Sequence, residues 1–131
     1  MALRQSKVLK WDQKVSVTVP NGTAGGTTTD TVFTPGKGKL FVVKELRIVT
    51  PVEVEAQVLF KQPGDPAVQL FQTRQLAGTD VTYDLTKLAN GGIECSQVTF
   101  RAVNPAQTTA ARTVDYYPKG AIYEMIPDGR D

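Results

Sequence analysis

The sequence contains no histidine and a single cysteine, Cys95. Histidine is the commonest general base, the usual partner of a nucleophilic serine or cysteine, and the commonest metal ligand. Its absence excludes a hydrolytic triad of the ordinary kind. A lone cysteine cannot form an internal disulfide, so the chain suits a reducing cytoplasm, and we expect Cys95 to be a core or near-core residue.

Long hydrophobic runs are also absent. No segment approaches the length that spans a bilayer, and residues 1–7 have no apolar run behind their positive charges. Lysine and arginine total fifteen against thirteen acidic residues, a formal net charge of +2. Because these charges are spread along the chain, the sequence predicts neither a membrane partner nor a nucleic-acid partner.

What is abundant is the pattern of β-strands. Residues 15–19 alternate strictly between valine and small hydroxyl residues, and residues 97–103 alternate again. The long hydrophobic stretch 40–49 loses its alternation at Lys44 and Glu45, where a β-bulge would return Leu46 to the inner face. The sequence predicts an all-β fold: an antiparallel β-sandwich of about eight strands, jelly-roll-like.

The same pattern divides the chain into three parts. Residues 1–14 are interpreted as a basic N-terminal arm or edge strand, residues 15–126 as the sandwich domain and residues 127–131 as a polar tail. Within the domain, the Gly/Thr-rich run 21–29 and the polar run 106–112 are predicted to be flexible loops. The last block, 113–126, is predicted to hold two aromatic-rich strands divided at residues 117–120.

Candidate chemistry is scarce in this chain. Asp80 with Asp84, and Glu53 with Glu55, are paired carboxylates that in principle suit Ca²⁺ or acid–base work. Charges at a spacing of two are, however, typical of a solvated sheet face. The sequence predicts no catalytic residue, no cofactor and no metal, so we expect a protein that is not an enzyme and has no small-molecule ligand.

The basic arm with Trp11 allows three interpretations. Its cations and the indole ring could meet phosphates and a base, it could be a solvated first strand, or it could attach to a protein partner. Trp11 or an exposed tyrosine could also stack on a sugar ring, as in a carbohydrate-binding or adhesin-type β-sandwich module of a tail or a cell surface.

Three segments carry a resemblance to a known class. They are the turn and strand at 34–43, Asn90-Gly91-Gly92, and the strand at 98–104. Their layout resembles the small jelly-roll or β-sandwich structural proteins of tailed bacteriophages, especially capsid decoration (cement) proteins. The resemblance implies a non-enzymatic homotrimer that is made in the host cytoplasm, located in the virion, and bound to a capsid lattice or another virion protein.

On this hypothesis, residues 3–11 contact the shell and aromatic residues of the last block supply subunit contacts. The predicted partner-binding residues are Arg4, Lys7, Lys10, Trp11, Tyr116, Tyr117 and Tyr123.

Overall fold

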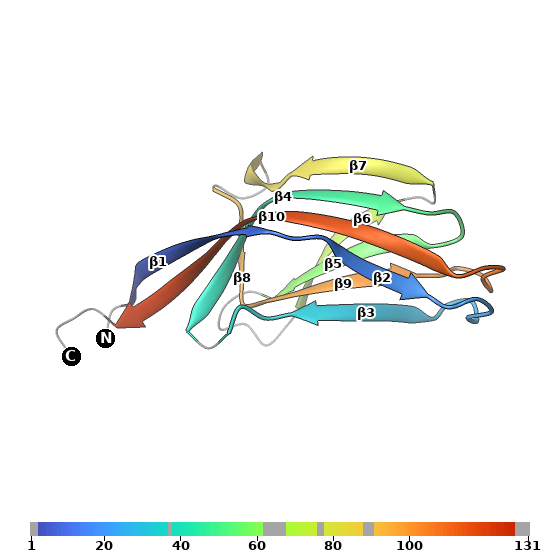
Figure 1. Ribbon diagram of the computed structural model, residues 1–131, viewed down its shortest axis with the longest axis horizontal. Coiled ribbons are helices and arrows are strands. Elements are labelled where there is room, and N and C mark those ends of the chain that lie inside the picture. Colours follow the sequence, from blue (N-terminus) through green and yellow to red (C-terminus); the bar gives the residue numbers. More distant parts are fainter. Residues whose placement is uncertain (1–2, 37, 62–67, 76–77, 88–90, 128–131) are drawn as a thin grey trace.

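The computed structural model describes residues 3–36, 38–61, 68–75, 78–87 and 91–127, and for residues 3–9, 68–75 and 125–127 it describes the backbone only. The fold is a sandwich of two antiparallel sheets (Figure 1). The six-stranded sheet A contains β1 (Leu3–Asp12), β2 (Val15–Val19), β4 (Lys39–Thr50), β7 (Thr79–Asp84), β8 (Ile93–Cys95) and β10 (Arg112–Pro127). The four-stranded sheet B contains β3 (Thr28–Phe33), β5 (Glu55–Lys61), β6 (Val68–Gln75) and β9 (Gln97–Val103). One 3₁₀ turn, η1 (Leu85–Lys87), follows β7.

Two long central strands, β4 and β10, organise sheet A. One edge of β10 pairs with β2 over residues 112–116 and with β1 over residues 119–127. The far edge of β4 likewise pairs with β7 in one half and with β8 in the other. Sheet A therefore continues beyond the sandwich, and we call its continuation the extension: β1, residues 119–127 of β10 and residues 39–43 of β4. Figure 1 shows it projecting at the lower left, with Leu3 and Pro127 paired at its tip.

The core lies between the sheets because each strand buries alternate residues. Strand β2 buries its valines and exposes its hydroxyl residues, and β9 sends Phe100 into the same core. The largest fully buried side chain is Tyr116 of β10, whose hydroxyl group donates a hydrogen bond to the carbonyl oxygen of Arg101 on the opposite sheet. Burial raises the pKa of this phenol. The all-β sandwich predicted from the alternation is confirmed, and the described residues form ten strands rather than about eight.

The predicted bulge is also present. In the pairing of β10 with β4, Lys119 lies opposite Glu45 and Gly120 lies opposite Val43, so Lys44 is the extra residue. Val43 and Leu46 are consequently both buried in the core, which an unbroken alternation would not allow.

The prediction of two strands in the last block is wrong, because β10 runs without a break from Arg112 to Pro127. Proline lacks a backbone N–H and normally interrupts a ladder. Pro118 is tolerated because it lies between the stretch paired with β2 and the stretch paired with β1, where no ladder partner faces that edge. Its carbonyl oxygen accepts a hydrogen bond from the backbone N–H of Gln13.

Strand β5 starts at Glu55, four residues after Pro51. Glu53 has a positive φ of 77°, a backbone conformation that belongs to a turn and that L-residues seldom adopt. Among the described residues, no helix is long and apolar enough to cross a membrane.

Candidate interaction surfaces

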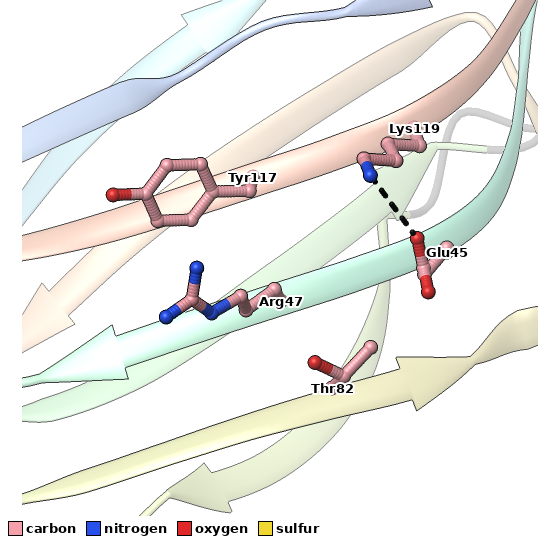
Figure 2. A pocket seen from close by; sticks show the side chains of 5 residues that line it. All are labelled: Glu45, Arg47, Thr82, Tyr117 and Lys119. Atoms are coloured by element: carbon pink, nitrogen blue, oxygen red, sulfur yellow. Dashed lines mark ion pairs between the residues drawn. The ribbon is translucent and has the colours of Figure 1, made fainter.

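A shallow pocket of about 160 Å³ lies on the outer face of sheet A (Figure 2). Strand pairing sets Tyr117, Arg47 and Thr82 side by side on three neighbouring strands. The next outward pair, Lys119 and Glu45, completes the lining. The pocket therefore follows directly from the register of β10, β4 and β7.

The charges of this pocket are already paired. The Arg47 guanidinium donates hydrogen bonds of 3.0 and 2.7 Å to the two carboxylate oxygens of Asp80, and Lys119 Nζ lies 3.8 Å from Glu45 Oε2. The hydrogen bond between Arg47 and Asp80 raises the pKa of the guanidinium and lowers the pKa of the carboxyl group. The charged groups of the lining are therefore all engaged in ion pairs, Arg47 with Asp80 beside the pocket and Lys119 with Glu45 within it.

The ring of Tyr117 is similarly engaged. The Arg47 guanidinium carbon lies 5.1 Å from the ring centroid and Lys14 Nζ lies 5.8 Å from it, both within the range of cation–π attraction. On sheet B, Arg101 donates hydrogen bonds of 2.7 and 2.9 Å to Asp30 across the β9–β3 pair. Both outer faces of the sandwich thus carry ion pairs between neighbouring strands, and the charges within each pair compensate one another.

Two of the predicted partner-binding residues lie in the core. Trp11 is 6% exposed, stacks on Phe41 with ring centroids 4.2 Å apart, and donates its indole N–H to Gln13 Oε1 at 3.2 Å. Tyr116 is fully buried. Neither side chain reaches a surface, because β1 and β10 turn these positions inward. We therefore remove both from the candidate contact surface.

The other predicted residues do not form one cluster. Tyr117 lies in the pocket, whereas Lys10 and Tyr123 lie on the extension, on the face opposite Trp11. Lys10 is exposed and Tyr123 is half-buried. The side chains of Arg4 and Lys7 are outside the described part of the structure, and their backbone pairs with Ile126 and Glu124.

The two carboxylate pairs singled out from the sequence do not form joint sites. Asp80 binds Arg47, while Asp84 accepts hydrogen bonds from the backbone N–H and the hydroxyl group of Thr86. Glu53 lies in a turn, and Glu55 begins a strand of sheet B. Where the structure describes the chain, no group of three or more acidic, cysteine or histidine residues could hold a metal ion. Cys95 is buried, and desolvation raises the pKa of its thiol to about 12.

A third surface was not found from the sequence. We call it the loop pole: residues 20–27 between β2 and β3, residues 51–54 between β4 and β5, and residues 104–111 between β9 and β10. Figure 1 shows these connections at the end of the sandwich away from the extension. The first and last of them overlap the runs 21–29 and 106–112 that were predicted to be flexible, yet they are hydrogen-bonded to each other.

Thr108 links the two longer loops. Its backbone N–H donates to the carbonyl oxygen of Thr23 and its carbonyl oxygen accepts from the N–H of Gly22, at 3.2 and 3.1 Å. Its hydroxyl group donates to the carbonyl oxygen of Pro20 at 2.9 Å and accepts from the N–H of Thr23 at 3.2 Å. Every hydrogen-bonding group of this buried residue thus contacts the neighbouring loop.

Asn104 forms a second link. Its side-chain amide donates hydrogen bonds to the backbone carbonyl oxygens of Thr23, Ala24 and Ala106. Its backbone carbonyl oxygen accepts a hydrogen bond from the backbone N–H of Gly26 at 2.6 Å. The residue is fully buried. The sequence carries no distinct signal for this role, because the Asn-Pro pair is equally typical of any loop start.

Glu53 attaches the third connection. Its carboxylate accepts hydrogen bonds from the backbone N–H of Thr109 at 3.1 Å, the Thr109 hydroxyl group at 2.6 Å and Arg112 Nε at 3.0 Å. The hydrogen bonds from Thr109, followed by that from Arg112, lower the pKa of Glu53. The unusual backbone conformation of Glu53 therefore coincides with a contact that joins two loops.

No protein-family model and no curated protein matches the chain. A chain of infectious bursal disease virus, Gt strain, is 14% identical with a TM-score of 0.35, over 95% of this chain and 32% of that chain, so the present chain spans about a third of it. A chain of tomato aspermy virus is 12% identical with a TM-score of 0.37, over 92% and 81% of the two chains. A carbohydrate-binding module of the β-sandwich superfamily is 11% identical with a TM-score of 0.32, over 87% and 56%. Likeness at this level carries neither an activity nor a partner over to this chain.

Proposed function

We propose that this chain is a non-enzymatic structural protein of a virion, a decoration protein that binds and stabilises a phage capsid lattice as a homotrimer. The observation that carries the proposal is the extension. It presents the ten-residue strand β1, which among the described strands pairs only with β10 and lies at the edge of sheet A.

An edge strand offers unpaired backbone groups to another chain, and strand addition is a common mode of protein recognition. The exposed cation Lys10 and the half-buried Tyr123 lie on one face of this extension. Their side chains combine charge with apolar area, which suits a protein partner. The faces of the sandwich are poorer candidates because their charges are paired internally.

The described side chains supply little material for catalysis. The thiol of Cys95 is buried with a raised pKa, and the carboxylates of Asp80 and Glu53 are bound to arginine partners. Trp11, which the carbohydrate-binding alternative named beside an exposed tyrosine, is held in the core. These features favour a role in assembly over a role in catalysis or sugar binding.

Truncation is a poor test, because β1 supplies the ladder partner for residues 119–127 of β10. We would instead measure cosedimentation of the chain with purified capsids that lack it, using the double variant Lys10→Glu with Tyr123→Ala. Lys87→Glu, an exposed charge reversal on η1, is the matched control.

The expected result is at least a tenfold weaker binding of the double variant, with the control binding as the wild type does. Normal binding by the double variant would remove the extension from the interface. Failure of the wild-type chain to cosediment would contradict the decoration function itself. Light scattering behind size exclusion tests the trimer independently of any capsid.

A further inference from the structure

The loop pole contains fewer charged residues than the rest of the chain. Residues 15–29 and residues 102–111 contain no lysine, arginine, aspartate or glutamate, although such residues make up 21% of the chain. The acidic side chain of Glu53 is bound by Arg112 and Thr109. What the pole exposes is small and neutral: Asn21, Ala24, Ala106 and Gln107.

The loop pole is also held in one conformation. The buried residues Asn104 and Thr108 use their side chains to join residues 20–27 to residues 104–111. Glu53 adds the turn between β4 and β5 through its bonds to Thr109. A surface that is fixed before binding loses less conformational entropy when a partner arrives.

An apolar side chain lies at the same end. Val52 is 52% exposed and precedes Glu53, which contacts the neighbouring loop directly. Interface cores are depleted in lysine, glutamate and aspartate. The loop pole shares this depletion and adds one exposed apolar side chain, whereas the extension and the two outer faces carry more charged residues.

We propose that the loop pole is the surface through which copies of this chain contact one another. The lack of charge favours a second copy of this chain as the partner, because two identical neutral surfaces meet without like-charge repulsion. The extension cannot do so as readily, because the sequence of β1 places Arg4, Lys7 and Lys10 within one strand. A contact around a rotation axis would bring several loop poles together and leave each extension pointing outward.

This inference rests on the homo-oligomer of the proposed function, but not on the capsid partner. It is tested by the mass of the full chain in solution, from light scattering behind size exclusion over a dilution series. The variant is Val52→Arg. The matched control is Val32→Arg, since Val32 is also a valine, is 53% exposed and lies on sheet B away from the loop pole.

The wild type and Val32→Arg are expected to elute at a multiple of the 14.2 kDa chain mass. Val52→Arg should dissociate at a concentration at least tenfold higher than either, while its far-UV circular dichroism stays that of the folded wild type. Gln107→Arg, a second exposed position on the loop pole, should repeat this result. A wild type that stays monomeric at every concentration would overturn the inference, as would a Val52→Arg variant that retains the wild-type mass.

The capsid assay separates this inference from the proposed function. If the wild type is oligomeric, Val52→Arg is monomeric and neither cosediments with capsids, the loop pole is confirmed as the contact and the decoration function is lost. If the wild type binds capsids as a monomer, the decoration function survives and the loop-pole contact does not.

Discussion

The two ends of this molecule hold their segments in place by different means. In the extension, β1 is attached by a backbone ladder to β10 and by the stacking of Trp11 on Phe41. At the loop pole, the connections between strands are joined by hydrogen bonds from Asn104, Thr108 and Glu53. The extension carries several charges on a regular strand, whereas the loop pole is an irregular but hydrogen-bonded surface whose single charged side chain, Glu53, is paired with Arg112.

The difference shows that regular structure and fixed structure are separate properties. A strand acquires its partners through the ladder, so its side chains are available for the core on one face and for solvent on the other. A loop has no ladder, so its backbone groups must be satisfied by side chains or water. The loop pole is fixed because buried polar side chains take on that task.

The largest expected effect is at the base of the extension. Trp11→Ala removes the ring that stacks on Phe41 and leaves a cavity, so we expect the free energy of unfolding to fall by about 3–5 kcal/mol. Urea denaturation measures this loss. Trp11→Phe, which keeps an aromatic ring, should lose much less. A loss below about 1 kcal/mol for the alanine variant would show that the indole does not anchor β1.

A second pair of substitutions tests the two glycines at which another segment of backbone lies too close for a side chain, one at each end of the molecule. At Gly120 an added Cβ would lie 1.9 Å from the carbonyl oxygen of Val42 in the bulge, whereas at Gly25 it would lie 2.9 Å from Ala106 Cα. We expect Gly120→Ala to cost about 3 kcal/mol, the upper part of the usual range for overpacking. Gly25→Ala should cost less, because its added Cβ overlaps the neighbouring backbone less deeply than the added Cβ at Gly120 does. Thermal unfolding of the two variants decides the order, and a larger loss for Gly25→Ala would reverse the comparison.

The third prediction concerns the loop pole alone. Asn104→Ala leaves the carbonyl oxygens of Thr23, Ala24 and Ala106 without this donor, which should cost about 1–3 kcal/mol. Amide hydrogen exchange should become faster at Gly22 while it stays unchanged at Ile122 in the extension. Equal acceleration at both ends would mean that Asn104 stabilises the whole fold rather than the loop pole.

The smallest effect is a dependence on pH. The pKa of Glu53 is lowered in the folded protein from its ordinary value of 4.5, so its stabilising contribution is complete above that pH and is lost as the pH falls through the folded pKa. In acid, the Thr109 amide should lose its protection from exchange in the wild type. In Glu53→Gln the loss should be present already at neutral pH.

Asp80→Asn is the comparison for this test, because it removes a carboxylate with a lowered pKa from sheet A instead of from the loop pole. It should change the acid dependence of overall stability and leave the exchange of Thr109 as in the wild type. A Thr109 amide that responds equally to both substitutions would contradict a local role for Glu53.

Much of the fold could be predicted because strand alternation is a local property. The valines of β2 and the alternation of β9 appear in the sequence as they appear in the core. The bulge at Lys44 could be predicted for the same reason, since a break in the period shows where one residue is extra. The buried state of Cys95 likewise agrees with the expectation of a core residue.

The candidate surfaces could be predicted only in part. Trp11 alternates with Lys10, which indicates that the two point to opposite faces, but not which face is covered. Pro118 predicts a break between two strands, and only the pairing of β1 and β2 on either side of it explains why β10 continues through it. The loops at 20–27 and 104–111 contain the residues that flexible loops contain, and only their adjacency gives Thr108 and Asn104 their partners.

The class of structure and the scarcity of reactive groups can be read from the residues alone, because a period of two and an absence of histidine need no knowledge of contacts. The tertiary structure decided that β1 closes on residues 119–127, that Trp11 and Tyr116 are buried, and that two neutral loops form one surface. The physical reason is that these features depend on pairings between segments far apart in the chain, which are selected by the burial of both partners together and not by the residues of either one.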